Sequence, residues 1–213
     1  MFTIHQRRPI RKTPKYNHIV LFVGRERQHV DLAIATGAKA LTLAIALRRS
    51  KPVAMQKITP FLWFDTEAEE AAKFYCSVFK NSKLGRILYY GETGPQPKGT
   101  VLTVEFTLDG VEFVALNGGP QFKFTEAVSF TVNCETQDEV DYYWDKLAAG
   151  GGEHGPCGWL KDKFGLSWQV SPTVLADMLA DKDETKSQRV MKAMMEMGKI
   201  DISTLQRAYD TAK

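Results

Sequence analysis

The chain has 213 residues, of which 44% are hydrophobic and 25% are charged. This balance excludes an intrinsically disordered chain, a collagen-like repeat and a disulfide scaffold. The net charge of +3 conceals an asymmetry, because residues 1–55 hold 11 Lys and Arg against 2 Asp and Glu, whereas residues 56–213 hold 17 against 23. The acidic second part argues against nucleic acid as a partner, since phosphate binding needs a basic face.

The cysteines bear on the cellular compartment. Cys76, Cys134 and Cys157 are odd in number and show neither a CxxC pair nor zinc-finger spacing. This usage favours reduced thiols, and we therefore expect a cytoplasmic protein.

Residues 1–55 form a basic N-terminal extension. Its apolar stretch at 31–47, DLAIATGAKALTLAIAL, is interrupted by Lys39 and is shorter than the roughly 20 residues that a bilayer requires, so we expect no membrane partner. The basic, acid-poor residues 7–15 would also fit an organelle-targeting segment. We prefer a natural start at Met55, three residues before the first well-patterned strand. The extension is then poorly ordered or upstream of that start, and residues 56–213 form the functional domain.

An internal repeat organises residues 56–213. A shift of 68 positions places Leu62 on Phe130 and Phe64 on Val132. Each copy has the pattern of a strand followed by an amphipathic helix, ITPFLWFD with EAEEAAKFYCSVF and AVSFTVN with TQDEVDYYWDKL. Thr136 and Glu139 have the spacing of a capping box at the second helix. The repeat predicts two modules, at residues 58–119 and 126–171.

The remaining elements complete an α+β fold. Three strand-like runs follow the first helix, and Asp109-Gly110 marks a hairpin between the last two. The second module is expected to be shorter, because Pro156 and three glycines break the run EHGPCGWLKDKFGLSWQV into two regular strands and an irregular one. Residues 172–213 are predicted to form helices, the first near Thr173 to Leu179. The expectation is therefore two βαβββ-type modules plus C-terminal helices.

Four segments carry a family resemblance. They are ITPFLWFDTEAEEAAKFY, SFTVNCETQDEVDYYWDKL, CGWLKDKFGLSWQVSP and RVMKAMMEMGKIDISTLQRAY. In this order they resemble the PhnB-like branch of the vicinal oxygen chelate superfamily, a branch often labelled 3-demethylubiquinone-9 3-methyltransferase. Over residues 56–210 the resemblance implies paired modules with curved mixed sheets around a cavity, often in a homodimer. The superfamily holds glyoxalases, extradiol dioxygenases, epimerases and antibiotic-resistance proteins, so it does not fix a reaction.

The resemblance also implies four places for ligands of a divalent metal. In this chain they hold Thr59, Asn117, Ala127 and Gln169, of which at most two are weak neutral donors. Catalytic zinc takes three protein ligands, and magnesium or calcium favours carboxylates. We therefore expect neither a metal centre nor a cofactor.

Two features leave an enzymatic role open. His154 and Cys157 lie three residues apart and could form a base and a nucleophile, although a histidine in an exposed glycine-rich loop is the simpler interpretation. Glu105 is the one carboxylate placed to point into a cavity, and it would equally suit an exposed position on a half-covered sheet. The E/D-x-G-x-G turn typical of class I methyltransferases follows none of the expected strands.

The sequence thus predicts a PhnB-like protein that binds a small molecule without the usual metal centre, as a cytoplasmic homodimer. A metal-dependent lyase, isomerase or dioxygenase of the glyoxalase type is the alternative, and methyl transfer is a weaker one. An apolar cavity with a few polar anchors is typical of small-molecule sites. The predicted ligand-binding residues are Phe61, Trp63, Glu105, Asn117, Ser129, Trp159 and Gln169.

Overall fold

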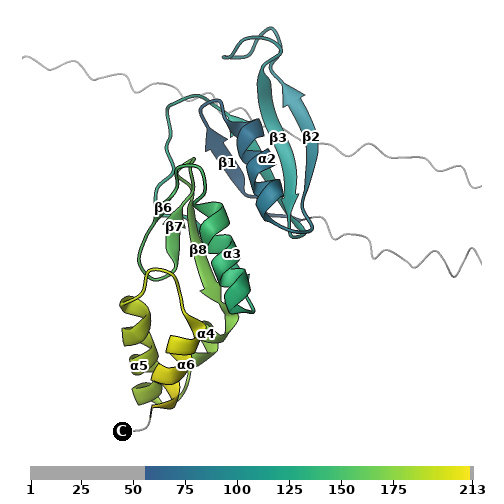
Figure 1. The fold of residues 1–213 in the computed structure, drawn as a ribbon. Coiled ribbons are helices and arrows are strands. Elements are labelled where there is room, and N and C mark those ends of the chain that lie inside the picture. The colour runs from purple at the N-terminus through teal and green to yellow at the C-terminus, as the bar shows by residue number, and fades with distance from the viewer. Residues whose placement is uncertain (1–55, 212–213) are drawn as a thin grey trace, which may run out of the picture. The chain divides into compact units, whose positions relative to one another are not determined.

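Strand, helix and three further strands follow one another twice along the chain (Figure 1). The computed structural model describes residues 56–211. The extension expected at residues 1–55 lies outside the described residues. The elements within residues 56–211 are those of the predicted α+β fold.

The first module contains β1 (Phe61–Phe64), α2 (Ala68–Val78), β2 (Lys83–Tyr89), β3 (Val101–Leu108) and β4 (Val111–Asn117). Its sheet has the order β1-β4-β3-β2, with β1 parallel to β4 and the other pairs antiparallel. Asp109 and Gly110 turn the β3–β4 hairpin with φ of 44° and 83°, which a tight two-residue hairpin requires. The predicted hairpin is confirmed.

The second module repeats this topology with β5 (Ser129–Cys134), α3 (Gln137–Leu147), β6 (Glu153–His154), β7 (Trp159–Lys161) and β8 (Ser167–Pro172). Its sheet order is β5-β8-β7-β6, so each first strand again pairs in parallel with the last. Strands β6 and β7 are short because the chain between them contains Pro156 and two residues with positive φ, Cys157 and Gly158. Both the repeat and the shortening agree with the prediction.

The predicted cap of α3 forms with one difference. The Thr136 hydroxyl accepts a hydrogen bond from the Glu139 backbone N–H at 3.2 Å. The Glu139 carboxylate accepts from the backbone N–H of Glu135, at 2.7 Å, rather than from Thr136 itself. Two backbone donors at the start of the helix are satisfied in this way.

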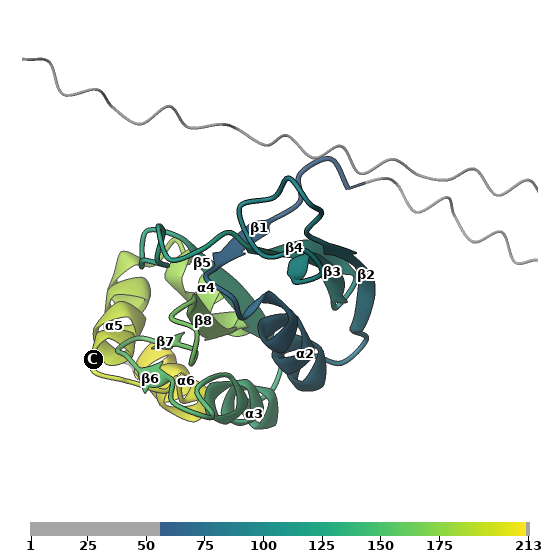
Figure 2. The same ribbon diagram turned by 90° about the horizontal axis from the view of Figure 1, so that it is seen from above.

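The C-terminal helices α4 (Thr173–Leu179), α5 (Glu184–Met195) and α6 (Ile202–Asp210) follow as predicted. They enclose a small core of their own that includes Leu175, Val190 and Leu205. Backbone hydrogen bonds from Cys157 and Gly158 to the carbonyls of residues 197 and 198 tie them to the second sheet. Figures 1 and 2 both show α5 and α6 next to each other.

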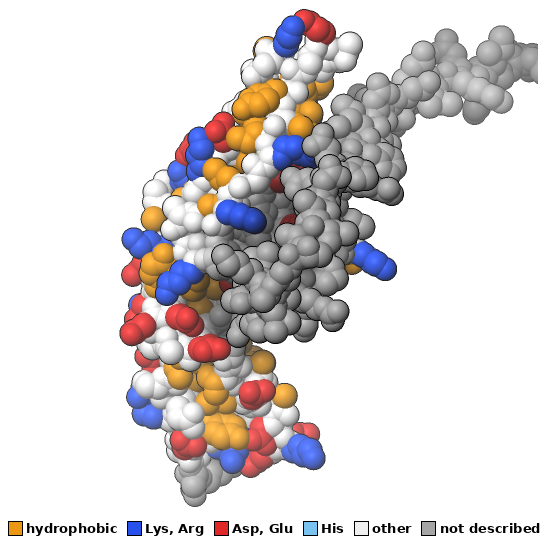
Figure 3. Space-filling view, turned by 90° about the vertical axis from the view of Figure 1, so that its right-hand side faces the viewer, with side chains coloured by type: hydrophobic (Ala, Val, Ile, Leu, Met, Phe, Trp, Pro, Cys, Tyr) orange, Lys and Arg blue, Asp and Glu red, His pale blue; other side chains and the backbone are white. Residues whose placement is uncertain are grey.

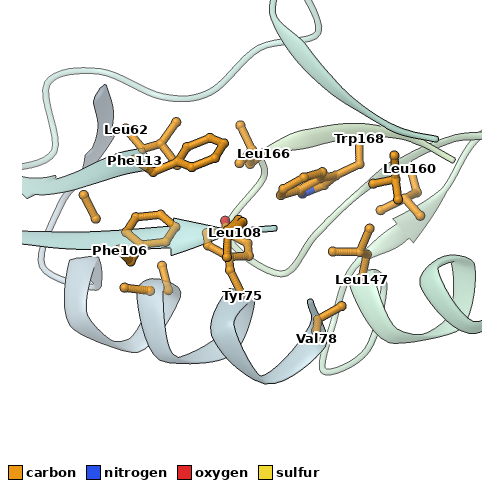
Figure 4. Close-up of a cluster of buried hydrophobic side chains, with 14 of the residues drawn as sticks. Leu62, Tyr75, Val78, Phe106, Leu108, Phe113, Leu147, Leu160, Leu166 and Trp168 are labelled. Carbon is orange, nitrogen blue, oxygen red and sulfur yellow. The ribbon is translucent and has the colours of Figure 1, made fainter. Parts of the chain in front are cut away.

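Helices α2 and α3 each cover one face of their sheet. Alternation along β1 buries Leu62 and Phe64 on the helix-covered face. The cores of the two modules are continuous, because Tyr75 of α2 packs against both Phe106 of β3 and Trp168 of β8 (Figure 4). Within residues 56–211, each helix is too short or too polar to cross a membrane.

Candidate functional site

The side of each sheet opposite its helix is called its open face below. In the first sheet, the strand register places Phe61, Val114 and Glu105 in one row of this face. Trp63, Leu116 and Thr103 form the next row. The open face of the first sheet is therefore largely apolar, and Phe61 is 53% exposed on it.

The open face of the second sheet has a different chemistry. One row holds Thr131, Gln169 and Trp159, and the next holds Ser129, Ser167 and Lys161. The Gln169 amide Nε2 donates a hydrogen bond to the Ser129 hydroxyl at 2.9 Å. Hydroxyl and amide groups dominate this face, and Trp159 supplies its aromatic surface.

Six of the seven predicted ligand-binding residues lie on these open faces, and Asn117 does not. The Asn117 Oδ1 accepts a hydrogen bond from the Ala68 backbone N–H at 2.8 Å, and its Nδ2 donates to the Val101 carbonyl at 3.0 Å. Both atoms of the amide are thus used to hold the start of α2 and an adjoining strand. Strand alternation from the buried Phe113 and Ala115 puts Asn117 on the helix-covered face, which corrects its predicted role.

Trp63 is partly covered by the segment that follows β4. Its indole N–H donates to the Gly119 carbonyl at 2.8 Å, and its ring meets Phe122 edge to face at 5.0 Å between centroids. Gly118 leaves the space that the indole ring occupies, because a Cβ at that position would lie 2.2 Å from it. A cavity of about 130 Å³ beside Trp63 is smaller than typical ligand pockets.

Glu105 and the pair His154 and Cys157, the candidates for an enzymatic role, each contact other residues. Glu105 accepts a hydrogen bond from the Arg86 guanidinium at 2.7 Å. The His154 ring stacks on Trp144 with centroids 4.4 Å apart, and the Cys157 Sγ lies 3.6 Å from the Met195 Sδ. Within the described part of the chain, no hydrogen bond joins His154 to Cys157.

A cavity with a volume of about 470 Å³ opens on the second sheet. Its lining is formed by Glu126, Glu153, His154, Gly155, Pro156, Trp159, Leu160, Lys161 and Ser167. The volume falls in the usual range for small-molecule sites. We call this cavity the β7–β8 pocket.

Two polar features distinguish the β7–β8 pocket. The Ser167 hydroxyl is fully buried, and no hydrogen-bond partner for it exists among residues 56–211. Lys161 forms an ion pair with Glu126. The hydrogen bond from Lys161 lowers the pKa of Glu126, and Glu126 in turn raises the pKa of Lys161.

Of the predicted ligand-binding residues, Trp159 lines this pocket, whereas Lys161, Ser167 and Glu126 were not predicted. The first two lie two residues from Trp159 and Gln169 along their strands, so alternation would have placed them on the same face. Glu126 lies outside any strand, and no local pattern associates it with Lys161.

Asp162 was not predicted as a functional residue either, although it lies in the segment CGWLKDKFGLSWQVSP that carries the family resemblance. Its buried carboxylate accepts hydrogen bonds from the Tyr75 hydroxyl and the Trp168 indole, both at 2.8 Å. It also accepts from the backbone N–H groups of Phe164 and Leu166. Burial raises the pKa of Asp162, and the four hydrogen bonds oppose that rise. The carboxylate thereby links α2 of the first module to the β7–β8 turn of the second.

At three of the four ligand places that the resemblance implies, the residues do not fit a divalent metal. Ala127 offers no side-chain donor, the Asn117 amide is bonded on the opposite face, and Gln169 is bonded to Ser129. Across residues 56–211, no group of three or more His, Cys, Asp or Glu side chains is arranged to hold an ion.

Comparison with known proteins identifies the family. The family model described as 3-demethylubiquinone-9 3-methyltransferase matches residues 56–171, more than half of the chain. The chain therefore belongs to this family, and the resemblance noted in the sequence is confirmed at that level.

Solved structures that resemble this chain include a described member of the same family and two more distant proteins. A structure described as a 3-demethylubiquinone-9 3-methyltransferase, PhnB protein, from Bacillus cereus is 42% identical, with a TM-score of 0.50. The match covers 55% of this chain and 100% of that one. Protein PA1353 from Pseudomonas aeruginosa is 20% identical over 55% of this chain and 97% of that one, with a TM-score of 0.46. The fosfomycin resistance protein FosX from Listeria monocytogenes is 16% identical over 57% and 96%, with a TM-score of 0.41. Among curated proteins, nothing matches.

Proposed function

We propose that this PhnB-like chain is a small-molecule-binding member of the vicinal oxygen chelate superfamily that works without the superfamily's metal centre. The observation that carries the proposal is the β7–β8 pocket, whose wall contains the Ser167 hydroxyl, a group without a hydrogen-bond partner within residues 56–211. A buried hydroxyl without a partner costs about 1–3 kcal/mol, and a ligand that bonds to it removes this penalty. The poor metal-ligand character of Asn117, Ala127 and Gln169 supports binding without a metal.

The pocket and the open faces supply the ligand-binding residues of this proposal. Trp159 offers an aromatic surface in the pocket, and the bonded pair Ser129 and Gln169 extends the polar surface beside it. Phe61, Trp63 and Glu105 belong to the proposal as the corresponding part of the first sheet. Asn117 is no longer included.

The proposal extends to the whole chain. We infer that residues 56–213 are the binding domain and that residues 1–55 are an extension without a part in binding. A cytoplasmic homodimer agrees with the thiol content and with the superfamily resemblance. Residues 56–213 hold more acidic than basic side chains, which supports a small molecule rather than nucleic acid as the partner. Figure 3 shows both kinds interspersed on the visible part of one face.

Methyl transfer is the second candidate, and the printed description of the family and of the Bacillus cereus structure favours it. It requires a methyl donor such as S-adenosylmethionine to bind. A binding function without chemistry requires no such donor.

A thermal-shift screen with aromatic small molecules and S-adenosylmethionine, with and without EDTA, separates the candidates. Aromatic compounds should raise the melting temperature of the wild type in EDTA, and Trp159→Ala should abolish this effect. Tyr89→Ala is the matched control, because Tyr89 is exposed on the edge strand β2 and does not line the pocket. Hits that need added metal would favour the metal-dependent lyase, isomerase or dioxygenase. S-adenosylmethionine as the only hit would favour methyl transfer.

A further inference from the structure

The charge of the ligand can be inferred from the Lys161–Glu126 ion pair, given the proposed function of the β7–β8 pocket. Both residues line that pocket. Lys161 ends strand β7 and lies directly opposite Ser167 of β8 in the strand register. Glu126 comes from the irregular segment between β4 and β5. A cation held by a sheet is thus paired with an anion from a loop.

The Glu126 carboxylate in this ion pair can be replaced by another carboxylate at little cost. The Glu126 side chain remains 62% exposed and that of Lys161 37% exposed. Exposed ion pairs contribute little to stability, because water stabilises each charge almost as well as the opposite charge does. Replacing the Glu126 carboxylate by another carboxylate would therefore lose little, while a ligand would also gain contacts with the pocket wall.

We propose that the β7–β8 pocket binds a small organic carboxylate whose charged group displaces Glu126 from Lys161. The carboxylate of Glu126 marks the position that the ligand's carboxylate takes. The Ser167 hydroxyl, opposite Lys161, donates its unused hydrogen bond to the same group. The body of the ligand lies against Trp159, Pro156 and Leu160.

The surrounding charges favour a carboxylate over a phosphate or phosphonate group. Glu153 lines the pocket together with Glu126, and among the lining residues that the structure describes, Lys161 is the one lysine or arginine. A dianionic group would meet two carboxylates and a single ammonium group. A singly charged carboxylate would neutralise the Lys161 ammonium group with one negative charge, as Glu126 does.

Isothermal titration calorimetry with the full chain tests this proposal, using 2-naphthoate, its neutral analogue 2-naphthamide and 2-naphthylphosphonate. The wild type should bind naphthoate at least about tenfold more tightly than naphthamide, and more tightly than the phosphonate. Lys161→Gln should remove the preference for naphthoate over naphthamide. Glu126→Gln should tighten naphthoate binding by about two- to fivefold, because the competing carboxylate is gone, and should leave naphthamide unchanged.

The exposed ion pair between Lys98 and Glu92 provides matched controls. It lies outside the pocket, so Lys98→Gln and Glu92→Gln make the same changes in net charge without touching the site. Neither should alter naphthoate binding by more than about twofold. Ser167→Ala should weaken naphthoate binding, and it should fold, since the hydroxyl it removes has no partner in residues 56–211.

Each contrary outcome has a distinct meaning. If Glu126→Gln weakens naphthoate binding, Glu126 is a ligand-binding group and the displacement is refuted. If naphthamide binds as tightly as naphthoate and Lys161→Gln affects neither, the carboxylate assignment is overturned while the pocket stands. If naphthoate binds but Trp159→Ala leaves its affinity unchanged, the pocket itself is wrong and the proposed function falls with it. If neither compound binds, the carboxylate proposal is overturned, and the thermal-shift screen decides on the pocket independently.

Discussion

Removal of a single hydroxyl group, in Tyr75→Phe, is expected to destabilise the protein measurably. The Tyr75 hydroxyl donates to the buried Asp162 carboxylate at 2.8 Å, and the Tyr75 side chain is completely buried. A hydrogen bond to a charged group contributes about 1.5–3 kcal/mol. Asp162 keeps three other donors in the variant, and the phenyl ring retains the packing of the tyrosine ring. We therefore expect a loss near the lower end, about 1.5–2 kcal/mol.

Urea unfolding followed by circular dichroism measures this loss. With about 2–4 °C per kcal/mol for a chain of this size, the melting temperature should fall by about 3–8 °C. Tyr142→Phe is the matched control, because the Tyr142 hydroxyl donates to the neutral Val78 carbonyl at 2.9 Å and is only partly buried. It should cost about 0.5–1 kcal/mol. A Tyr75→Phe variant no less stable than Tyr142→Phe would refute the assigned importance of the Asp162 network.

The same substitution has a signature in the titration of Asp162. Burial raises the pKa of this carboxyl above its usual value, and the hydrogen bond from Tyr75 opposes the rise. Loss of that bond in Tyr75→Phe should therefore raise the pKa further, which a carboxyl NMR titration detects. Because the folded state holds this proton more tightly than the unfolded chain, titration of Asp162 alone lowers the free energy of unfolding as pH rises through the folded pKa. A pKa that falls in the variant would contradict this account.

Three further predictions concern the strand register, the extension and the metal. Phe64→Ala should cost about 3–5 kcal/mol in urea unfolding, because Phe64 is 4% exposed and packs against Phe124 and Phe164. Phe61→Ala should cost less than about 1 kcal/mol, and the reverse order would show that the faces of β1 are misassigned. Deletion of residues 1–54 should change the melting temperature by no more than about 2–4 °C, and a larger loss would show that the extension stabilises the domain. Protein purified without chelator should carry far less than one equivalent of divalent metal by elemental analysis, whereas stoichiometric metal lost in Gln169→Ala would restore the metal-centre hypothesis.

The elements of this fold could be predicted because their signals are local. The spacing of apolar residues predicts α2 and α3, and Asp109-Gly110 predicts the hairpin between β3 and β4. The 68-residue offset predicts that the second module repeats the first, and both sheets have the same strand order. Propensity, periodicity and turn chemistry act over a few residues, so they can be read without the tertiary structure.

The open faces were predicted less completely, because the register of a strand must be counted from a residue whose burial is known. The alternation assigned to β1 placed Phe61 and Trp63 on the open face. In β4, the buried Phe113 and Ala115 place Asn117 under α2, and the sequence alone does not show which of its alternating residues are buried. A shift of one residue reverses the face of every side chain, so a single misassigned position changes its role.

The sequence by itself determined the family, the order of the elements and the residues that form most of each core face. Tertiary structure alone decided which distant side chains share a site. The hydrogen bond between Tyr75 and Asp162 spans 87 positions, and the Lys161–Glu126 ion pair joins a strand to an irregular segment. Within residues 56–211 the Ser167 hydroxyl has no hydrogen-bond partner, and this likewise follows from its burial rather than from its neighbours in the chain. Such contacts depend on how the two sheets and the segment between them pack, and no local periodicity encodes the distance between residues that only folding brings together.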